Sequence, residues 1–456
     1  MPRARRAAAV LLSLAALSSA PARGEEAQQQ QPPPEEKAPE QKAGEQKAPE
    51  KQRPTGWALQ GLPVVNYDSD EGFGFGGLLL LVDRADGTYE PYRYLISLQL
   101  FQTTGGISSH ILKVDAPNAF GTRWRLGGRL RYGYDKFAPY YGLGNTAPYQ
   151  PELWECDDRD ALKVDPDVCP GNPAFRGLRY ASYQLGTFPE IELDVRRTLA
   201  GPWKLYFGYR FRRNEVRAHY SAEDLGQAGD SRLVEDARAG LLTGYDGTAP
   251  DPVAFQLSEL VLGIQFDQRD QEASPADGMF HELSTRVASR FIGSRFDYGG
   301  ATLHLRFWKS IPIFSRPPVI GLRLLADALG GEVPISRLSS FGGLNGKEGL
   351  GGSNSIRGIL KNRKQGAVKV LGNVELRWLP IAFEAWKQRF QFGAAAFGDA
   401  GRVWSDLRFQ DGGGLSAGVG GGLRMTWNRE FVFRVDYGVG LTDPTRGLYL
   451  EFNQMF

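Results

Sequence analysis

Regular alternation between apolar and polar side chains is the feature that most constrains the fold of this chain, and it is clearest near the C-terminus. In residues 431–441, apolar side chains occupy every second position, and charged residues and glycines occupy most positions between them. The apolar set is Phe431, Phe433, Val435, Tyr437, Val439 and Leu441. A β-strand sends successive side chains to opposite faces, so this period of two predicts a strand with one apolar and one polar face.

Sixteen segments along the chain are candidate strands. They lie at about 57–66, 72–83, 92–103, 107–117, 122–136, 178–199, 202–218, 254–270, 278–291, 295–309, 317–329, 366–379, 389–404, 413–427, 430–441 and 446–456. Most of them have the roughly ten residues that a tilted transmembrane strand needs. The number is even, as in single-chain bacterial barrels.

Composition favours the same class of fold. No apolar stretch is long enough for a membrane-spanning helix, yet 12% of the residues are aromatic and 57 are glycine. A closed barrel with one lipid-facing and one wet face accounts for this balance. We therefore predict an all-β fold, a transmembrane antiparallel β-barrel of the outer-membrane type.

The connections between these segments alternate in length. Counted from a periplasmic N-terminus, the connections on the outer side include the long stretches 137–177, 219–253 and 330–365. The connections on the other side are short. Long outer loops and short periplasmic turns are typical of outer-membrane barrels.

The N-terminus has the layout of an exported protein. Three early arginines precede an apolar run and the sequence Ala20-Pro21-Ala22, which predicts a signal peptide over residues 1–22. Residues 23–56 consist mainly of Glu, Gln, Lys, Ala and Pro, which predicts a disordered periplasmic linker. The barrel is then expected over residues 57–456.

Two cysteines, Cys156 and Cys169, flank an acidic stretch in one of the long loops. In an exported protein such a pair predicts a local disulfide. The acids between them are an alternative calcium site, but their spacing matches no EF-hand, and a solvated acidic loop is the favoured interpretation.

Nothing in the remaining residues indicates chemistry. The four histidines lack the spacing of a metal site, and the motifs GFGFGG (72–77) and GLSAG (414–418) fall within predicted strands rather than at a strand-to-helix turn. We expect no metal, no cofactor and no catalytic residues, so the protein is not expected to be an enzyme. The net charge of +2 argues against a nucleic-acid partner.

The chain ends on LYLEFNQMF. The alternating side chains Leu450, Phe452 and Phe456 resemble the C-terminal signal by which outer-membrane barrels are recognised for assembly. Gln454 interrupts the apolar stripe.

Five segments resemble the BamA/TamA family of outer-membrane proteins, whose barrels are also called bacterial surface antigen barrels. They are FDQRDQEASPADGMF (266–280), GGSNSIRGI (351–359), GNVELRW (372–378), AFGDAGRVW (396–404) and GVGGGLRMTWNREFVFRVDYGVGL (418–441). Together they extend over about 266–456 in the order found in the family.

The resemblance implies a specific contact. In the family, the sixth outer loop folds into the barrel lumen, where its arginine meets acids of the inner wall. Arg357, between Ile356 and Gly358, matches that arginine, and Asp399 and Glu375 match the acids. In a water-filled lumen such an ion pair is expected to contribute only about 0–1 kcal/mol. It would therefore fix the position of the loop more than it would stabilise the barrel.

Two departures from the family accompany the resemblance. Ile359 stands where the family has an aromatic residue, which puts the aromatic contact of that position in doubt. The periplasmic POTRA domains, which receive clients in the family, have no counterpart in residues 23–56, so we expect a barrel that lacks them.

These observations predict an outer-membrane protein that aids the insertion or translocation of protein or lipid, with the seam between strands 57–66 and 446–456 as its opening. The alternative is a passive pore or a structural surface antigen without insertase activity. The expected partners are outer-membrane lipid and lipopolysaccharide, the assembly machinery during biogenesis, and a periplasmic accessory protein.

Overall fold

A computed structural model describes the chain in eight ranges and one isolated residue. These are residues 55–87, 89, 92–150, 178–218, 230–247, 252–344, 346–385, 388–428 and 431–456. The predicted signal peptide, all but the last two residues of the predicted linker, and the cysteine pair Cys156 and Cys169 lie outside them. The fold described below belongs to the unit Arg53–Phe456.

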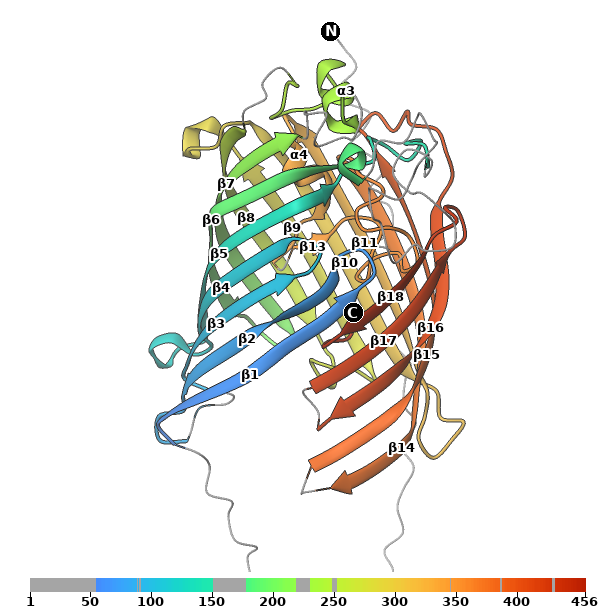
Figure 1. Ribbon diagram of the computed structural model, residues 1–456. Coiled ribbons are helices and arrows are strands. Elements are labelled where there is room, and N and C mark those ends of the chain that lie inside the picture. Colours follow the sequence, from blue (N-terminus) through green and yellow to red (C-terminus); the bar gives the residue numbers. More distant parts are fainter. Residues whose placement is uncertain are drawn as a thin grey trace, which may run out of the picture. The chain divides into compact units, whose positions relative to one another are not determined.

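Sixteen antiparallel strands form a closed barrel, as the sequence predicts (Figure 1). Each strand pairs with its neighbours in the wall, and the first strand also pairs with the last, which closes the barrel. The strands of the wall are β1 (Trp57–Asp68), β2 (Gly72–Asp83), β3 (Tyr94–Thr103), β4 (Ile107–Ala116), β5 (Trp124–Pro139), β6 (Ser182–Thr198), β7 (Trp203–Ala218), β8 (Val253–Asp267), β9 (Gly278–Ala288), β10 (Tyr298–Ser310), β11 (Val319–Gly331), β14 (Val368–Ala385), β15 (Gln388–Trp404), β16 (Ser416–Trp427), β17 (Phe431–Gly440) and β18 (Arg446–Glu451).

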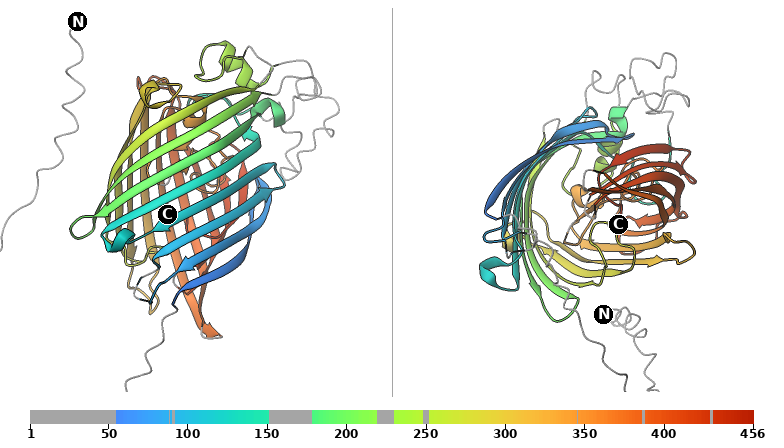
Figure 2. Two further views of the ribbon diagram at one scale, coloured as in Figure 1. Left: turned by 90° about the vertical axis from the view of Figure 1, so that its left-hand side faces the viewer. Right: turned by 90° about the horizontal axis from the view of Figure 1, so that it is seen from below.

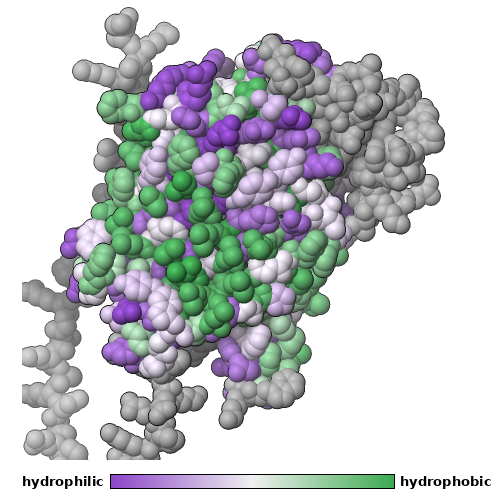
Figure 3. Space-filling model, turned by 60° about the vertical axis from the view of Figure 1, so that its left-hand side comes forward, coloured by the Kyte–Doolittle hydropathy of each residue, from purple (hydrophilic) through white to green (hydrophobic). Residues whose placement is uncertain are grey.

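The predicted faces of the strands are those of the barrel wall. In β17, Tyr437 and Val439 are exposed on the outside, whereas Arg434 and Asp436 are fully buried on the inside. Hydrophobic side chains gather across the middle of the face drawn in Figure 3, and hydrophilic ones lie above them. This apolar band is the surface that a bilayer would cover. Among the described residues, no helix is both long and apolar enough to cross a membrane.

The last strand is shorter than predicted. We expected it to run over 446–456, but β18 ends at Glu451 and the last residues turn into the barrel. Met455 and Phe456 are buried there against Phe280, Trp308 and other side chains of the facing wall. An extended strand would point the amide of Gln454 into the lipid, and burying a polar group without partners costs free energy. In the observed turn, Gln454 Nε2 donates a hydrogen bond to Ser274 Oγ at 3.3 Å, whereas Gln454 Oε1 has no hydrogen-bond partner in the described protein.

The long connection between β11 and β14, residues 332–367, is the sixth outer loop and is called loop 6 below. It contains α4 (Ile335–Leu338) and a two-stranded sheet of β12 (Ser340–Phe341) and β13 (Lys347–Glu348). Seen from below, this orange segment lies inside the wall (Figure 2). Loop 6 therefore occupies part of the lumen.

A hydrophobic cluster occupies the outer mouth of the barrel. It joins the helix α3 (Arg232–Arg238) to loop 6 and to the upper ends of several strands. Leu233 and Val234 of α3 and Ile335 of α4 are fully buried in it. The remaining elements are the short 3-10 turns η1 (Ala119–Gly121), η3 (Leu178–Ala181) and η4 (Arg290–Ile292).

Candidate functional site

Loop 6 places Arg357 against the inner wall of the barrel. Its Nε and Nη2 donate to the two carboxylate oxygens of Asp399 on β15, at 2.9 and 3.1 Å. Its Nη1 donates to Glu375 on β14 at 2.8 Å. The resemblance implied both acids as partners of Arg357, and the structure brings all three together.

Sequence reasoning missed a third carboxylate partner, Asp436 on β17. Its Oδ2 accepts a hydrogen bond from Arg357 Nη1 at 3.1 Å. The alternation of β17 had placed Asp436 on the lumen face, but nothing in the local sequence connects it with a loop 79 residues away. We call Arg357, Glu375, Asp399 and Asp436 the lumen cluster.

Backbone geometry next to Arg357 demands glycine. Gly358 has a φ of +93°, and a Cβ at this position would meet the backbone of Gly438 and Val439 at 2.5–2.6 Å. Loop 6 therefore lies directly on β17 at this point. Gly358 N also donates to Tyr449 Oη of β18 at 3.0 Å. Both the φ and the close approach exclude residues with a side chain.

Aliphatic packing fixes the residues on either side. Ile356 and Ile359 are buried in a cluster with Leu350 of the same loop and with Leu371 and Val403 of the wall. The position where the family has an aromatic residue is thus filled by the aliphatic Ile359. The aromatic contact of Arg357 comes instead from Phe397, whose ring centroid lies 3.3 Å from the guanidinium carbon.

Further arginines balance the charge of the lumen cluster. Arg424 pairs with Glu375 at 3.0 Å, and Arg434 pairs with Asp436 at 2.8 Å. Burial alone would lower the pKa of Arg357, but the charges of Asp399 and Glu375 outweigh it and raise that pKa above its ordinary value. Arg357 therefore stays protonated.

The burial of the lumen cluster changes its expected energetic role. We expected an ion pair in a water-filled lumen, but the side chains of Arg357, Asp399 and Asp436 are fully buried. Removing one partner of a buried pair leaves an uncompensated charge and costs about 3–5 kcal/mol. The cluster should therefore matter for stability as well as for the position of the loop.

Loop 6 is also attached to the opposite wall. Arg337 pairs with Glu259 of β8, with its Nε at 2.9 Å from the carboxylate. Leu344 N donates to Glu282 of β9 at 2.7 Å, and Leu344 O accepts from Arg210 of β7 at 2.9 Å. These contacts join residues 62 to 134 positions apart, and no sequence pattern indicated them.

A further contact joins loop 6 to the turn between β1 and β2. Lys361 Nζ pairs with Glu71 and, at 3.2 Å, with Glu348, and Lys361 N donates to Asp70 at 2.8 Å. Burial raises the pKa of Asp70 to about 7, more than the hydrogen bond from Lys361 N lowers it. This turn directly follows the two residues of β1 that pair with β18.

The raised pKa of Asp70 predicts a pH dependence. In the unfolded chain its pKa is near 3.8, so only the folded protein holds this proton between that pH and about 7. The free energy of unfolding contributed by Asp70 should therefore fall as the pH rises through this window and level off above it. Asp70→Asn should remove that part of the pH dependence. The measurement is the temperature at which gel mobility changes, determined at pH 5 and pH 8 for the wild type and for Asp70→Asn. An equal shift between the two pH values in the wild type and the variant would contradict the prediction.

The seam between β1 and β18 is short. Only Tyr67–Leu450 and Asp68–Tyr449 face each other as paired residues. One further hydrogen bond joins Ser69 N to Leu448 O at 3.1 Å. In contrast, β1 pairs with β2 along all twelve of its residues. The free edge of residues 57–66 therefore has no strand partner among the described residues.

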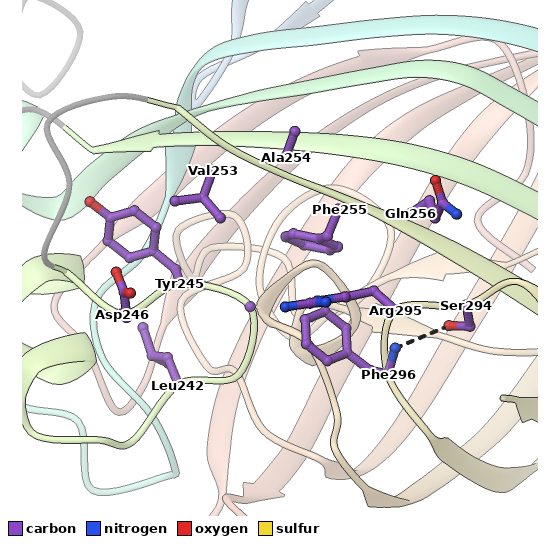
Figure 4. Close-up of a pocket in the computed structure, with 11 residues that line it drawn as sticks. Leu242, Tyr245, Asp246, Val253, Ala254, Phe255, Gln256, Ser294, Arg295 and Phe296 are labelled. Carbon is purple, nitrogen blue, oxygen red and sulfur yellow. Dashed lines mark hydrogen bonds between the residues drawn. The ribbon is translucent and has the colours of Figure 1, made fainter. Parts of the chain in front are cut away.

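A hollow of about 570 Å³ opens on the outer side, between the loops that follow β7 and β9 (Figure 4). Phe255 and Phe296 meet edge to face in it, with ring centroids 5.4 Å apart. Phe255 belongs to the hydrophobic cluster of the outer mouth.

In the described part of the chain, no group of three or more His, Cys, Asp or Glu side chains is arranged to hold a metal ion.

A family model, the Omp85 superfamily domain, matches residues 118–456. The chain belongs to the Omp85 superfamily. This family and the sixteen-stranded barrel place it in the bacterial outer membrane. No curated protein matches the chain in sequence.

Solved structures show the same fold. BamA from Haemophilus ducreyi lacking POTRA domains 1–3 is 14% identical, with a TM-score of 0.55 over 88% of this chain and 70% of that chain. CdiB from Escherichia coli is 12% identical, with a TM-score of 0.51 over 89% of this chain and 63% of that chain. This Omp85 chain is thus similar in fold to two proteins that are longer than itself.

Proposed function

We propose that this Omp85 chain aids the insertion or translocation of protein or lipid at the outer membrane, without catalysing a chemical reaction. The observation that carries the proposal is the two-residue pairing between β1 and β18. The unpaired edge of residues 57–66 offers backbone N–H and C=O groups to an incoming strand. Strand addition to a free sheet edge is a general mode of peptide recognition.

The lumen cluster supports the proposal through loop 6. We propose that Arg357 acts as a latch that holds this loop against β14, β15 and β17, next to the seam. Gly358 and Tyr449 connect the same loop with β18. With loop 6 fixed, the wall would remain in register when the short β1–β18 pairing separates.

A passive pore is the less favoured function. A pore needs a continuous water path, whereas the outer mouth contains the hydrophobic cluster around α3 and the lumen contains loop 6. The partners that follow from insertion or translocation are membrane lipid, lipopolysaccharide and the assembly machinery. We also propose a partner in the periplasm, an accessory protein that delivers clients. Cross-linking in the host tests this partner, and recovery of no periplasmic protein would argue against it.

The test is a reconstitution. The purified chain in liposomes should accelerate the insertion of an unfolded outer-membrane barrel, or the movement of labelled lipid between leaflets, relative to an unrelated barrel with a fully paired seam. Rates equal to those of the unrelated barrel in both assays would refute the proposal. Steady ion conductance without either activity would instead favour the passive pore as the function.

A further inference from the structure

A cavity of about 680 Å³ lies at the end of the lumen away from α3, the end that the loop lengths assign to the periplasm. Its wall is formed by the ends of strands β5 to β10 and by residues of the β4–β5, β6–β7 and β8–β9 turns. Gly342 and Leu344 of loop 6 also line it. We call this cavity the vestibule.

The vestibule is strongly basic. Seven arginine and lysine side chains line it, against three aspartate and glutamate side chains. Two of these acids, Asp267 and Glu282, already have partners. Asp267 binds both Lys204 and Arg269, at 3.1 and 2.8 Å, and Glu282 accepts hydrogen bonds from Tyr206 and from Leu344 N. Arg125 is also paired, with Asp115 outside the lining at 2.7 Å. The excess of positive charge therefore lies with the other four arginines of the lining, Arg123, Arg196, Arg197 and Arg306.

Two guanidinium groups inside the vestibule lack a strong partner. Arg196 is 4.0 Å from Asp194, which already pairs with Arg210 at 2.9 Å. Arg306 forms no ion pair with any described residue, and it stacks on Phe280 at 4.4 Å. The Nε atoms of both arginines are buried without a hydrogen-bond partner in the described protein. Buried donors of this kind normally have a partner.

The positive charge continues over the rim to the outside of the barrel. Arg196 and Arg197 are consecutive on a strand, so they point to opposite faces. Arg197 stacks on the exposed Trp124 at 5.0 Å, where tryptophan is typical of a membrane interface. The exposed Arg123 precedes Trp124 in the adjoining turn. Arginine side chains therefore extend from the vestibule over the rim to the membrane surface.

We propose that the vestibule binds the phosphate headgroup of an anionic phospholipid from the leaflet at this rim. Guanidinium groups match phosphate oxygens through paired hydrogen bonds, which ammonium groups cannot reproduce. Anionic lipids are further attracted by clustered Arg and Lys at a membrane surface. This site is separate from the β1–β18 seam and does not depend on the proposed function.

The experiment measures binding of short-chain phosphatidylglycerol to the full chain in an uncharged detergent, by titration calorimetry. Arg196→Gln with Arg306→Gln should weaken binding by about tenfold or more, since both substitutions remove charge-assisted hydrogen bonds to the phosphate. The matched control, Arg295→Gln with Arg408→Gln, removes the same charge from exposed outer loops and should bind like the wild type. Short-chain phosphatidylcholine, which has no net charge, should bind more weakly than phosphatidylglycerol.

Three outcomes would overturn the proposal. Equal binding by the wild type and the vestibule variant would place the lipid elsewhere. Equal losses of affinity in the vestibule variant and the outer-loop control would show that binding depends on net charge alone and not on the vestibule. Inorganic phosphate binding as tightly as the lipid would assign the site to soluble phosphate.

A second variant covers the case in which the double variant does not show the heat-modifiable mobility of a folded barrel. Arg123→Gln, at an exposed position, then replaces it and should weaken lipid binding severalfold.

Discussion

Arg357→Ala should destabilise the barrel by about 3–5 kcal/mol, because it leaves the buried Asp399 and Glu375 without their shared partner. Asp399→Ala should cost less, since Arg357 keeps Glu375 and Asp436. The double variant should lose less than the sum of the two, because the charges that oppose each other are removed together. Arg357→Lys should recover only part of the stability, since lysine cannot bind Asp399 through two nitrogens.

The measurement is heat-modifiable mobility in gels together with antibiotic sensitivity of the host. The matched control is the pair Arg408 and Asp406, which is also an Arg–Asp ion pair, at 2.9 Å, but lies exposed in an outer loop. Its alanine variants should behave like the wild type. If Arg357→Ala also behaved like the wild type, the latch would have no role, and the family resemblance would concern the fold alone.

Covalent closure of the seam should abolish the proposed activity. Tyr67 and Leu450 face each other across it, so Tyr67→Cys with Leu450→Cys brings two thiols within the reach of a disulfide. In a background with serine at 156 and 169, oxidation should reduce client insertion or lipid movement to the rate of empty liposomes. A reductant should restore it, because the only change is the bond that prevents separation of β1 from β18.

Cross-linking within the wall provides the control for that experiment. Leu59→Cys with Leu81→Cys joins the same strand β1 to β2, with which it is paired along its full length. Oxidation there should leave the activity unchanged, because the seam stays free. Full activity of the oxidised seam variant would show that protein or lipid does not pass between β1 and β18.

The C-terminal residues illustrate where local pattern and tertiary structure part. Leu450, Phe452 and Phe456 alternate in sequence, yet only the first belongs to β18, and Phe456 is buried inside the barrel. Phe452 packs outside, against Phe431 and Phe433, at 5.5 and 5.3 Å between ring centroids. Their role as an assembly signal remains a prediction that concerns the chain before it has folded, when an inward turn does not yet exist.

The sequence by itself determined the sixteen strands of the barrel and which side of the strands faces lipid. These properties are local: the period of two and the lengths of the connections follow from the geometry of a single strand and from the solvent on each face. The pairing of Arg357 with Asp399 and Glu375 came from family resemblance, because a loop arginine has no local sign of its partner.

Only the tertiary structure decided the rest of the site. Asp436 joins Arg357, Leu344 meets Glu282, and the arginines of the vestibule gather because closure of the barrel brings distant strands around one lumen. The same closure buries the lumen cluster, so that an ion pair expected in water becomes one that is costly to break. The two-residue seam is likewise a property of the closed wall, since pairing between the first and last strands exists only once the barrel has formed.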